Sequence, residues 1–369
     1  MKVGLLTSSR ADFSIYFPLI NKLNQDKFFD LNLIVFGSHL SEDYGHTIDN
    51  IIKMGISVKF KVKTPKTDTS PFEISNSISN TINAFAKFWS DNNDFDLVFC
   101  LGDRFEMFSA VIAGIPFQIK FAHIHGGETT LGAIDNVFRH SITLASKYHF
   151  TSTSKAKQKV AKLLGESSNI FYVGSLGLES MSSTKVLSVE DFFNKWRIDL
   201  SEKTILTTFH PETIAIEMNA KYSQALIESI ERLNKYQFLI TMPNADTEGR
   251  IVRELLINAF ANSKRVFLIE NLGVESYFSA MYHCSLLLGN TSSGIIEAAT
   301  FNKWVINIGD RQKGRESGGN VINVPIDTKI IIDTVNNLIN HKAPANKNLY
   351  FSGLSASDEI IKQLKNKFH

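Results

Sequence analysis

Cysteine is scarce in this sequence, which has two cysteines among 369 residues. Cys100 and Cys284 lie far apart, each within an apolar run, so we expect two buried thiols and neither a disulfide framework nor a zinc site. Short-period repeats and low-complexity tracts are also absent. With 43% hydrophobic and 21% charged residues, the composition is that of an ordinary globular protein.

An excess of charge of one sign is lacking too. The 39 basic and 37 acidic residues leave a net charge of +2, which argues against a nucleic-acid partner but leaves room for a local cationic pocket that binds phosphate. No apolar run approaches the roughly 20 residues needed to cross a bilayer, and the apolar stretch near the N-terminus is too short for a signal peptide. We therefore expect a cytoplasmic protein without a membrane partner.

What the chain does contain is a strand–helix alternation that occurs twice. Its length suits two domains, and alternating short apolar runs and amphipathic stretches indicate parallel sheets covered by helices. We predict an α/β fold of two Rossmann-like domains, residues 1–178 and 179–350, that face each other across a cleft, with a C-terminal helix in 351–369 that packs on the first domain. The polar segment 179–189 is the expected linker. The expected strands cover 3–9, 31–37, 96–102, 119–125, 148–153 and 170–175 in the first half, and 204–209, 237–242, 265–270, 285–290 and 304–309 in the second.

Polar motifs follow the ends of two strands in the first half, where ligands of such sheets bind. In TSSRAD (7–12), Arg10 and its small neighbours suit an anion, and a capped helix start with a solvated arginine explains them equally well. In LGDRFE (101–106), Asp103 stands next to Arg104 and could be a catalytic acid, a helix cap or half of an ion pair. Neither motif alone decides between these interpretations.

The segment AHIHGGETTLGAIDNVFRHS (122–141) crowds ionisable side chains around a Gly-Gly turn. They are His123, His125, Glu128, Asp135, Arg139 and His140. Such a group would be costly as mere packing, although Arg139 and His140 equally suit a salt bridge and a helix–sheet contact. His123 and His125 are two apart in the predicted strand and would share a face that suits zinc. Because no compact motif for a third ligand stands out, we predict no metal.

Two motifs of the second half follow strands and carry weaker signals. His210 in TFHPET (208–213) should project from the end of a strand, although a lone histidine is usually structural. In MPNADTEGR (242–250), Asn244 and Asp246 can be ligands or turn formers.

The strongest physical signal is LLLGNTSSGIIEAA (286–299), a buried strand followed by a small polar loop and a helix expected from Gly294 to Ala299. The hydroxyls of Ser292 and Ser293 and successive backbone N–H groups would point at one spot with the helix dipole behind them, which predicts a diphosphate site. Glu297 is placed to accept hydrogen bonds from two vicinal ribose hydroxyls. An ordinary capped helix is the weaker interpretation.

A glycine-rich loop with basic residues, NIGDRQKGRESGGNVI (307–322), follows the last predicted strand. Arg311, Lys313 and Arg315 among small neighbours suit a phosphate clamp, and a surface loop is the alternative.

Taken together, these motifs resemble those of the hydrolysing UDP-N-acetylglucosamine 2-epimerases of bacterial sialic-acid synthesis. The matching stretches occur in order to about residue 325: SRAD (9–12), LGDRFE (101–106), HIHGGE (123–128) with Asp135 and RHSIT (139–143), FHPET (209–213), NAD (244–246), GNTSSGIIE (289–297) and IGDRQKGR (308–315). Several of these stretches alone are unspecific, and their combination is highly specific.

The resemblance implies a GT-B-like fold, a homodimer, and an enzyme that needs neither a metal nor NAD. Its substrate would be UDP-N-acetylglucosamine (UDP-GlcNAc), and its products UDP and N-acetylmannosamine. UDP would be eliminated across C1–C2 to leave a 2-acetamidoglucal, and water would then add at C1 and a proton at the opposite face of C2.

The same resemblance, together with the chemistry, suggests roles for residues of this sequence. Removal of the C2 proton needs a positioned base, and the departing diphosphate needs cations. The expected catalytic residues are Asp103, His125, Glu128, Asp135 and His210. The residues expected to bind the UDP sugar are Arg10, Arg104, His210, Asn244, Asp246, Ser292, Ser293, Gly294, Glu297 and Arg311, with Arg10, His210, Ser292, Ser293 and Arg311 on the diphosphate and Glu297 on the ribose.

One position departs from the family's common pattern. Many relatives carry glutamate, in a stretch reading HIE, where this sequence has His125, and a subgroup carries histidine as here. The base that removes the C2 proton can be His125, whose imidazole titrates near neutrality. Alternatively it is Asp103 or Asp135, with His125 orienting the acetamido group.

Other activities share parts of this pattern. A sister group acts on UDP-2,4-diacetamido-2,4,6-trideoxyglucose in legionaminic-acid synthesis, and NADTEGR (244–250) looks somewhat like that group. A non-hydrolysing epimerase would keep UDP on its product, a GT-B glycosyltransferase would need an acceptor groove, and a nucleotide-sugar sensor would not need the acids. The ionisable cluster in 123–140 favours acid–base work on the sugar over glycosyl transfer, and Asp103, Glu128 and Asp135 together argue against a sensor. The resemblance favours the hydrolysing epimerase, with UDP-GlcNAc as the expected substrate.

Overall fold

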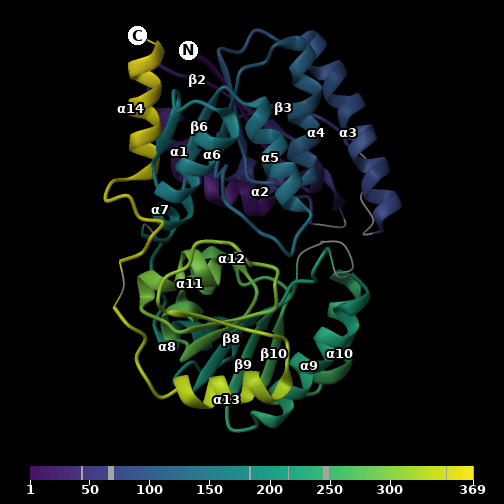
Figure 1. The fold of residues 1–369 in the computed structure, drawn as a ribbon, viewed down its shortest axis with the longest axis vertical. Coiled ribbons are helices and arrows are strands. Elements are labelled where there is room, and N and C mark those ends of the chain that lie inside the picture. The colour runs from purple at the N-terminus through teal and green to yellow at the C-terminus, as the bar shows by residue number, and fades with distance from the viewer. Residues whose placement is uncertain are drawn as a thin grey trace. The chain divides into compact units, whose positions relative to one another are not determined.

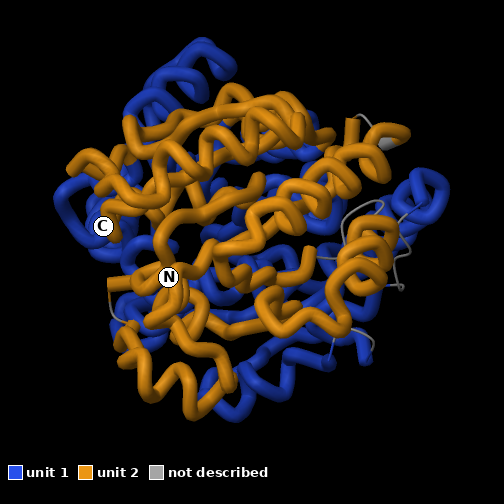
Figure 2. Tube along the Cα trace, turned by 90° about the horizontal axis from the view of Figure 1, so that it is seen from below, with its two compact units in different colours: residues 1–128, 135–180, 350–369 blue, residues 129–134, 181–349 orange. Residues whose placement is uncertain are grey.

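The computed structural model divides the chain into two compact units (Figure 2). It describes residues 1–42, 45–64, 70–182, 184–214, 216–243, 249–345 and 347–368. Unit 1 comprises residues 1–128, 135–180 and 350–369, and unit 2 comprises residues 129–134 and 181–349. Within the described ranges, no helix combines the length and the apolar character needed to span a membrane.

Unit 1, whose helices are labelled in Figure 1, is built on a parallel sheet. Its described strands run in the order β3-β2-β1-β4-β5-β6-β7. The strands are β1 (Lys2–Thr7), β2 (Asp30–Val35), β3 (Val58–Lys61), β4 (Leu97–Leu101), β5 (Phe121–Ile124), β6 (Tyr148–Thr151) and β7 (Ile170–Tyr172). A central strand such as β4 is apolar and buried along its whole length, because helices cover both faces of a doubly wound sheet. The strand order reverses between β1 and β4, and this switch point is where such sheets bind ligands.

Unit 1 contains a series of helices, some of which start at a capping side chain. They are α1 (Arg10–Gln25), α2 (Ile48–Lys53), α3 (Pro71–Asp91), α4 (Phe105–Gly114), α5 (Asp135–Ala145), α6 (Ser154–Leu164), α7 (Leu176–Ser182) and α14 (Ala356–Phe368). Helix α1 starts at Arg10 because Ser9 and Asp12 form a reciprocal capping box. Helix α3 starts after Ser70, whose hydroxyl accepts a hydrogen bond from the N–H of Glu73.

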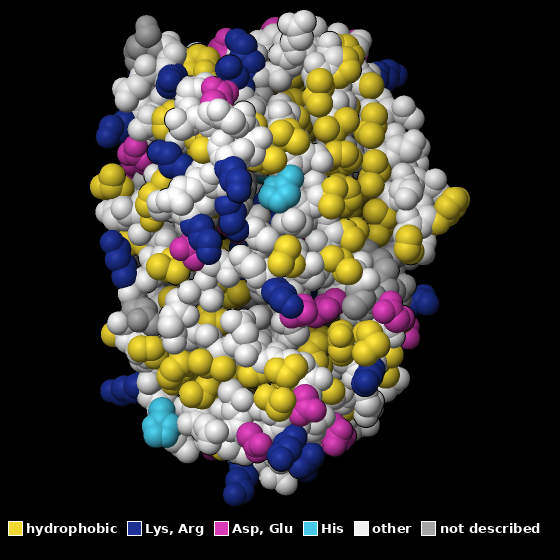
Figure 3. Space-filling model, in the orientation of Figure 1, with side chains coloured by type: hydrophobic (Ala, Val, Ile, Leu, Met, Phe, Trp, Pro, Cys, Tyr) yellow, Lys and Arg dark blue, Asp and Glu magenta, His cyan; other side chains and the backbone are white. Residues whose placement is uncertain are grey.

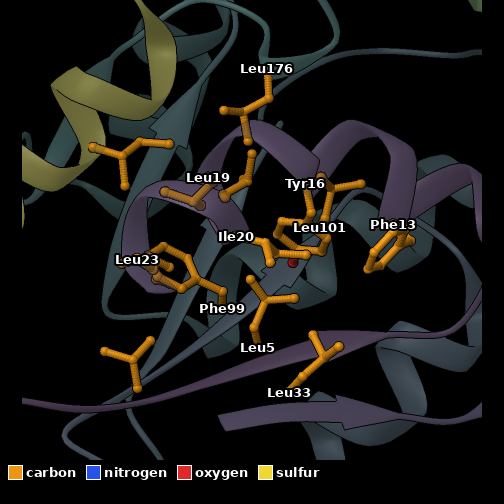
Figure 4. Packing of buried hydrophobic residues seen from close by; sticks show 14 of the residues in the cluster. Leu5, Phe13, Tyr16, Leu19, Ile20, Leu23, Leu33, Phe99, Leu101 and Leu176 are labelled. Atoms are coloured by element: carbon orange, nitrogen blue, oxygen red, sulfur yellow. The ribbon is translucent and has the colours of Figure 1, made fainter. Parts of the chain in front are cut away.

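Two hydrophobic clusters lie on the two faces of the sheet of unit 1. In the first, α1 and α14 pack on the central strands. Figure 4 shows the contribution of α1 and the strands, which includes Leu5, Phe13, Tyr16, Leu19, Ile20, Leu23, Leu33, Phe99 and Leu101. In the second, Phe85 and Trp89 of α3 pack with Phe36, Phe121 and Cys100. Both cysteines of the chain are free and buried, as the sequence predicts.

Unit 2 repeats the same plan with a parallel sheet in the order β10-β9-β8-β11-β12-β13. Its strands are β8 (Thr204–Thr208), β9 (Gln237–Thr241), β10 (Val266–Ile269), β11 (Leu286–Gly289), β12 (Val305–Ile308) and β13 (Val321–Val324). Its α-helices are α8 (Val189–Trp196), α9 (Asn219–Arg232), α10 (Gly249–Phe260), α11 (Gly273–His283), α12 (Ser292–Ile296) and α13 (Thr328–Leu338). The switch point of this sheet lies between β8 and β11. The chain thus has two parallel-sheet α/β domains, as the strand–helix alternation predicts.

Two strands escaped the sequence prediction, β3 and β13. Each is the outermost strand of its sheet. An edge strand buries little, so β3 alternates half-buried and exposed residues along Val58–Lys61 and lacks the continuous apolar run of a central strand. The predicted alternation is therefore most informative for the strands in the middle of each sheet.

Candidate active site

Asp103 lies at the switch point of unit 1, two residues after the end of β4. Its carboxylate forms an ion pair with the guanidinium of Arg139, a residue of α5 whose side chain is 2% exposed. Arg139 also donates a hydrogen bond of 3.1 Å to the backbone carbonyl of Glu128. A buried guanidinium needs such partners because an uncompensated charge is costly to bury. Of the structural alternatives for Asp103, the ion pair is the one observed, since Arg104 occupies the N-cap position of α4.

His123 and His125 do not share a strand face, so that prediction is wrong. Strand β5 ends before His125, whose backbone is left-handed with a φ of 64°, and the two-residue repeat of a strand no longer applies there. His123 is fully buried, and its Nε2 donates to the carbonyl of Gly102 across 2.8 Å. His125 is 8% exposed, and its N–H donates to the carbonyl of Phe150. His123 is thus a core residue that supports the end of β4, and His125 belongs to the turn.

Burial keeps two imidazoles of unit 1 neutral. Desolvation lowers the pKa of His123 to about 3 and that of His149 to about 4, from an ordinary value of 6.5. We expect the free energy of unfolding to fall as the pH is lowered below 6.5, because the unfolded chain then takes up protons that the folded chain does not. Each histidine contributes at most about 1.4 kcal/mol per pH unit. Urea unfolding at about pH 7.5, 6 and 5 measures this slope above the range in which carboxylates titrate.

A matched pair of variants assigns the slope. His123→Gln should flatten it, whereas His46→Gln, at a position whose side chain is 45% exposed, should leave it unchanged. An equal slope in wild type and His123→Gln would show that the proton uptake comes from elsewhere.

Glu128 and Asp135 stand at the two ends of a short segment, residues 129–134, that belongs to unit 2. Glu128 is 7% exposed, and its carboxylate accepts a hydrogen bond of 2.6 Å from the hydroxyl of Ser152. Asp135 is half-buried and is the first residue of α5, one turn before Arg139, so the two side chains share a helix face. Arg139 is therefore a common neighbour of the predicted acids: it pairs with Asp103, bonds the backbone of Glu128 and follows Asp135.

The segment 129–134 is held by hydrogen bonds within unit 2. The N–H of Leu131 donates to the carbonyl of Lys313 across 2.9 Å, and the N–H of Ile134 donates to the hydroxyl of Thr213 across 3.0 Å. The segment between two predicted acids is thus fixed to the loops that follow β8 and β12.

The two arginines of unit 1 that the sequence analysis assigns to the substrate lie at helix starts. Arg10 is exposed at the first position of α1, which matches the capped helix start with a solvated arginine. Arg104 is bound by both carboxylate oxygens of Glu106, at 3.2 Å from Nε and 3.0 Å from Nη2. Their roles in binding substrate stay predictions.

The loop before Arg10 is ordered by a buried carboxylate, Asp12, which is 4% exposed. It accepts hydrogen bonds from the hydroxyl of Thr7 at 2.6 Å and from the N–H and the hydroxyl of Ser8, both at 2.8 Å. Burial alone would raise the pKa of Asp12, but His39, Thr7 and Ser8 lower it below its usual range. The carboxylate therefore stays ionised and keeps the loop after β1 in one conformation.

In unit 2, the loops that follow β8, β11 and β12 meet at one residue, Asn290. Its side chain binds the backbone of His210, which is 6% exposed, and its carbonyl accepts hydrogen bonds from Arg311 and Gln312. Glu212 joins the same loops, because its carboxylate accepts the N–H of Asp310 at 2.8 Å. His210 and Arg311, both predicted phosphate ligands, are thus both hydrogen-bonded to Asn290.

The loop after β11 is arranged differently from the prediction. The helix expected over 294–299 is instead the five-residue α12, which ends at Ile296 and is followed by a 3₁₀ turn, Ala298–Phe301. Gly294 lies inside α12, and Glu297, 9% exposed, caps its end. So short a helix supplies little dipole. The helix dipole therefore adds little to the predicted anion site. The groups that still suit an anion there are the hydroxyls of Ser292 and Ser293 and the guanidinium of Arg311.

Ser293 has a partner that the sequence analysis does not mention, Tyr277 of α11. The two hydroxyls form a hydrogen bond, and the hydroxyl of Thr291 lies 3.3 Å from that of Ser293. Burial raises the pKa of Tyr277 to about 12, so its hydroxyl stays protonated and fixes the orientation of the Ser293 hydroxyl.

Two predicted ligands, Asn244 and Asp246, lie outside the described residues. For the residues that the structure does describe, no cluster of three or more His, Cys, Asp or Glu side chains suits a metal ion.

A comparison of the whole chain with family models decides its affiliation. The model described as UDP-N-acetylglucosamine 2-epimerase matches residues 21–365. This chain belongs to that family.

Relatives of this family extend over most of the chain. Polysialic acid biosynthesis protein P7 of Escherichia coli is 34% identical over 91% of this chain and 85% of its own length. The UDP-N,N'-diacetylbacillosamine 2-epimerase (hydrolyzing) of Legionella pneumophila is 30% identical over 99% of this chain and 95% of its own length. The crystal structure of UDP-GlcNAc 2-epimerase of Methanocaldococcus jannaschii in complex with UDP-GlcNAc and UDP matches 99% of this chain and 100% of that chain with a TM-score of 0.83 and 18% identity. The fold of this epimerase-family chain is therefore GT-B-like.

Four residues next to predicted site residues of this epimerase-family chain carry no predicted catalytic or binding role: Arg139 in unit 1, and Glu212, Tyr277 and Asn290 in unit 2. Arg139, Glu212 and Asn290 stand inside the motifs that carry the family resemblance, and Tyr277 stands in an amphipathic helix. Arg139, Glu212 and Asn290 could have been recognised in the sequence because each is a polar residue close to the end of a buried strand or to a turn. Their partners are far away in sequence, so the motif alone did not indicate what they bind.

Proposed function

We propose that this chain is a hydrolysing 2-epimerase that converts UDP-GlcNAc and water into UDP and N-acetylmannosamine. The observation that carries the proposal is the group of acids around Arg139 in unit 1, because a sensor or a simple transferase does not need several carboxylates held in place near the sugar. The relation to a hydrolysing epimerase over 99% of the chain supports the hydrolysing subtype. Synthesis of sialic acid is the proposed pathway, and the relation to a polysialic acid biosynthesis protein supports it.

In the proposed reaction, a base of unit 1 removes the proton on C2 while the C1–O bond to UDP breaks, which leaves a 2-acetamidoglucal. Water then adds at C1, and a proton returns to the opposite face of C2. Asp103, His125 and Asp135 are the candidates for the base, and Glu128 completes the group around the hexose. Unit 1 contains most of the first domain that the sequence predicts, residues 1–178. This unit would thus act on the sugar.

The departing UDP would be held by unit 2. His210 and Arg311 stabilise the negative charge that develops on the diphosphate, together with Ser292 and Ser293. Glu297 would accept hydrogen bonds from the ribose. Arg10 of unit 1 is a further proposed cation.

A second substrate is favoured by a specific observation. The Legionella relative is named for UDP-N,N'-diacetylbacillosamine, a sugar that carries an acetamide in place of the C4 hydroxyl and lacks the C6 hydroxyl. The chemistry at C1 and C2 is the same for both sugars, so the same catalytic residues would serve.

The decisive experiment is an NMR time course of the purified protein, without added metal, offered each UDP sugar separately. Free UDP and N-acetylmannosamine from UDP-GlcNAc would support the proposal. Turnover of the diacetamido sugar alone would keep the mechanism and change the substrate. A UDP-linked product would indicate a non-hydrolysing epimerase, and the absence of UDP release from both sugars would contradict the enzyme assignment.

We also propose that the protein forms a homodimer through unit 1. Figure 3 shows hydrophobic side chains gathered on one face over the region of α3, α4 and α5, and Phe72, Val137 and Leu144 of α3 and α5 are 71%, 66% and 59% exposed. A patch of this kind marks a protein contact.

The double variant Val137→Asp, Leu144→Asp should be a monomer in analytical ultracentrifugation. The control is Leu354→Asp, because Leu354 is similarly exposed, at 61%, elsewhere in unit 1. This variant should stay a dimer. A monomeric wild type would contradict the proposal.

A further inference from the structure

The side chain of Asn290 makes two hydrogen bonds with the backbone of one residue, His210. Asn290 is fully buried. Its Oδ1 accepts the N–H of His210 at 2.7 Å, and its Nδ2 donates to the carbonyl of the same residue at 2.8 Å. Asparagine can do this because its amide has both a donor and an acceptor, whereas aspartate only accepts and alanine does neither. The backbone of His210 is thus held at both polar groups although it lies beyond the end of β8.

The main chain of Asn290 reaches the third loop of the group. Its carbonyl accepts hydrogen bonds from Nη1 of Arg311 at 3.3 Å and from Nε2 of the buried Gln312 at 3.0 Å. One residue therefore connects the loop that carries His210 with the loop that carries Arg311. These loops follow β8 and β12, which pair with β11 on its two sides.

A second asparagine, Asn219, holds a backbone residue in the same way. The residue that it holds is Glu212, two residues after His210. Oδ1 of Asn219 accepts the N–H of Glu212 at 2.9 Å, and Nδ2 donates to the carbonyl of Glu212, also at 2.9 Å. Asn219 is fully buried as well. Pro211, between the two held residues, has no N–H to satisfy. The backbone of residues 210–212 is therefore fixed at both ends.

We propose that Asn290 is a positioning residue that sets His210 and Arg311 in a fixed relation, with Asn219 holding the far side of the same loop. The inference rests on the proposed function, in which the side chains of both residues stabilise the departing diphosphate. Stabilisation of a transition state depends on groups held in place before the reaction, and a displacement of about 1 Å can lower the rate about 100-fold. Asn290 would itself touch neither the sugar nor UDP.

The test is a double-mutant cycle on kcat with Asn290→Ala and His210→Ala. We expect Asn290→Ala to lower kcat about 10- to 100-fold, with a smaller change in KM, in the wild type and less than about 3-fold in the His210→Ala background. Asn320→Ala is the matched control: Asn320 is 1% exposed and its amide donates to the carbonyl of Lys303, before the start of β12. It should leave kcat within about 3-fold. An equal loss from Asn290→Ala in both backgrounds would overturn the proposal.

The outcome stays decisive if the alanine variant does not fold or if the substrate proves wrong. Asn290→Asp keeps the size of the side chain and the acceptor for the His210 N–H and removes the donor, so it should show the same dependence on His210. If the wild type turns over neither UDP sugar, the proposed function fails. The inference is then tested by a second double-mutant cycle, Asn290→Ala with Arg311→Ala, in which the affinity for UDP is measured by calorimetry. Non-additive losses of UDP affinity would support it. Additive losses, or a wild type that does not bind UDP, would overturn it.

Discussion

Asp103→Asn is expected to lower kcat by about 10²- to 10⁴-fold, the range typical of a lost general acid or base. The substitution keeps the size of the side chain but removes the charge at the end of β4 that pairs with Arg139. UDP affinity should change by less than about 3-fold, because the proposed UDP ligands of unit 2 are not altered. Turnover of UDP-GlcNAc by NMR and UDP binding by calorimetry measure the two effects separately.

The control for this prediction separates chemistry from folding. Removing the charge of Asp103 leaves Arg139, which is 2% exposed, without its ionic partner, and such a loss destabilises a protein. Thermal unfolding is therefore followed in parallel, and kinetics are measured well below the midpoint. Asp94→Asn removes a carboxylate from an exposed ion pair with Lys2 in the same unit and should leave kcat unchanged. A folded Asp103→Asn variant with a near-normal rate would remove Asp103 from the mechanism.

Gly289→Ala is expected to destabilise the protein by roughly 2–5 kcal/mol, the sum of a left-handed backbone and an overpacked contact. Gly289 ends β11 with a φ of 146°, and an added Cβ would overlap the backbone carbonyl of Thr208 in the neighbouring strand β8. Backbone cannot move aside as a flexible side chain can. Thermal unfolding followed by circular dichroism should show a midpoint lower by about 10 °C.

Another glycine of unit 2 isolates the two contributions. Gly273 also has a positive φ, of 69°, but an added Cβ would meet nothing within 4 Å. Gly273→Ala should therefore cost only the backbone part, about 1–2 kcal/mol. Equal destabilisation by the two substitutions would show that the close approach of β8 and β11 at Gly289 contributes nothing.

The central sheets and the places of the candidate residues along them were predictable from sequence. Apolar runs such as Leu97–Leu101 indicate buried strands because only a strand between two helical layers is apolar along its whole length. In parallel sheets the carboxyl ends of the strands share an edge, so polar residues after successive strands were expected to gather. The register confirms this for unit 1, where Leu101 pairs with Ile124 and thus places Asp103 and His125 just beyond adjacent strand ends.

The conformation of individual turns was less predictable. A strand repeat continued through His125 puts it on the face of His123, but the chain turns into a left-handed conformation at that residue. The helix after β11 likewise begins two residues earlier and ends three residues earlier than the expected range of 294–299. Both differences arise at element ends, where capping and tertiary contacts outweigh the intrinsic pattern.

By itself, the sequence determined the fold class, the strands of the two sheet centres, the buried thiols and the family, because these depend on local periodicity and on short motifs. Only the tertiary structure decided the partners of the polar side chains. Arg139 reaches Asp103 across 36 residues and Asn290 reaches His210 across 80, while residues 129–134 join unit 2 although both of their neighbours in the chain belong to unit 1. The physical reason is that a buried polar group must be paired. The local sequence indicates that a buried polar side chain needs a hydrogen-bond or ionic partner. The identity of that partner depends on how strands and helices that are distant in sequence pack together.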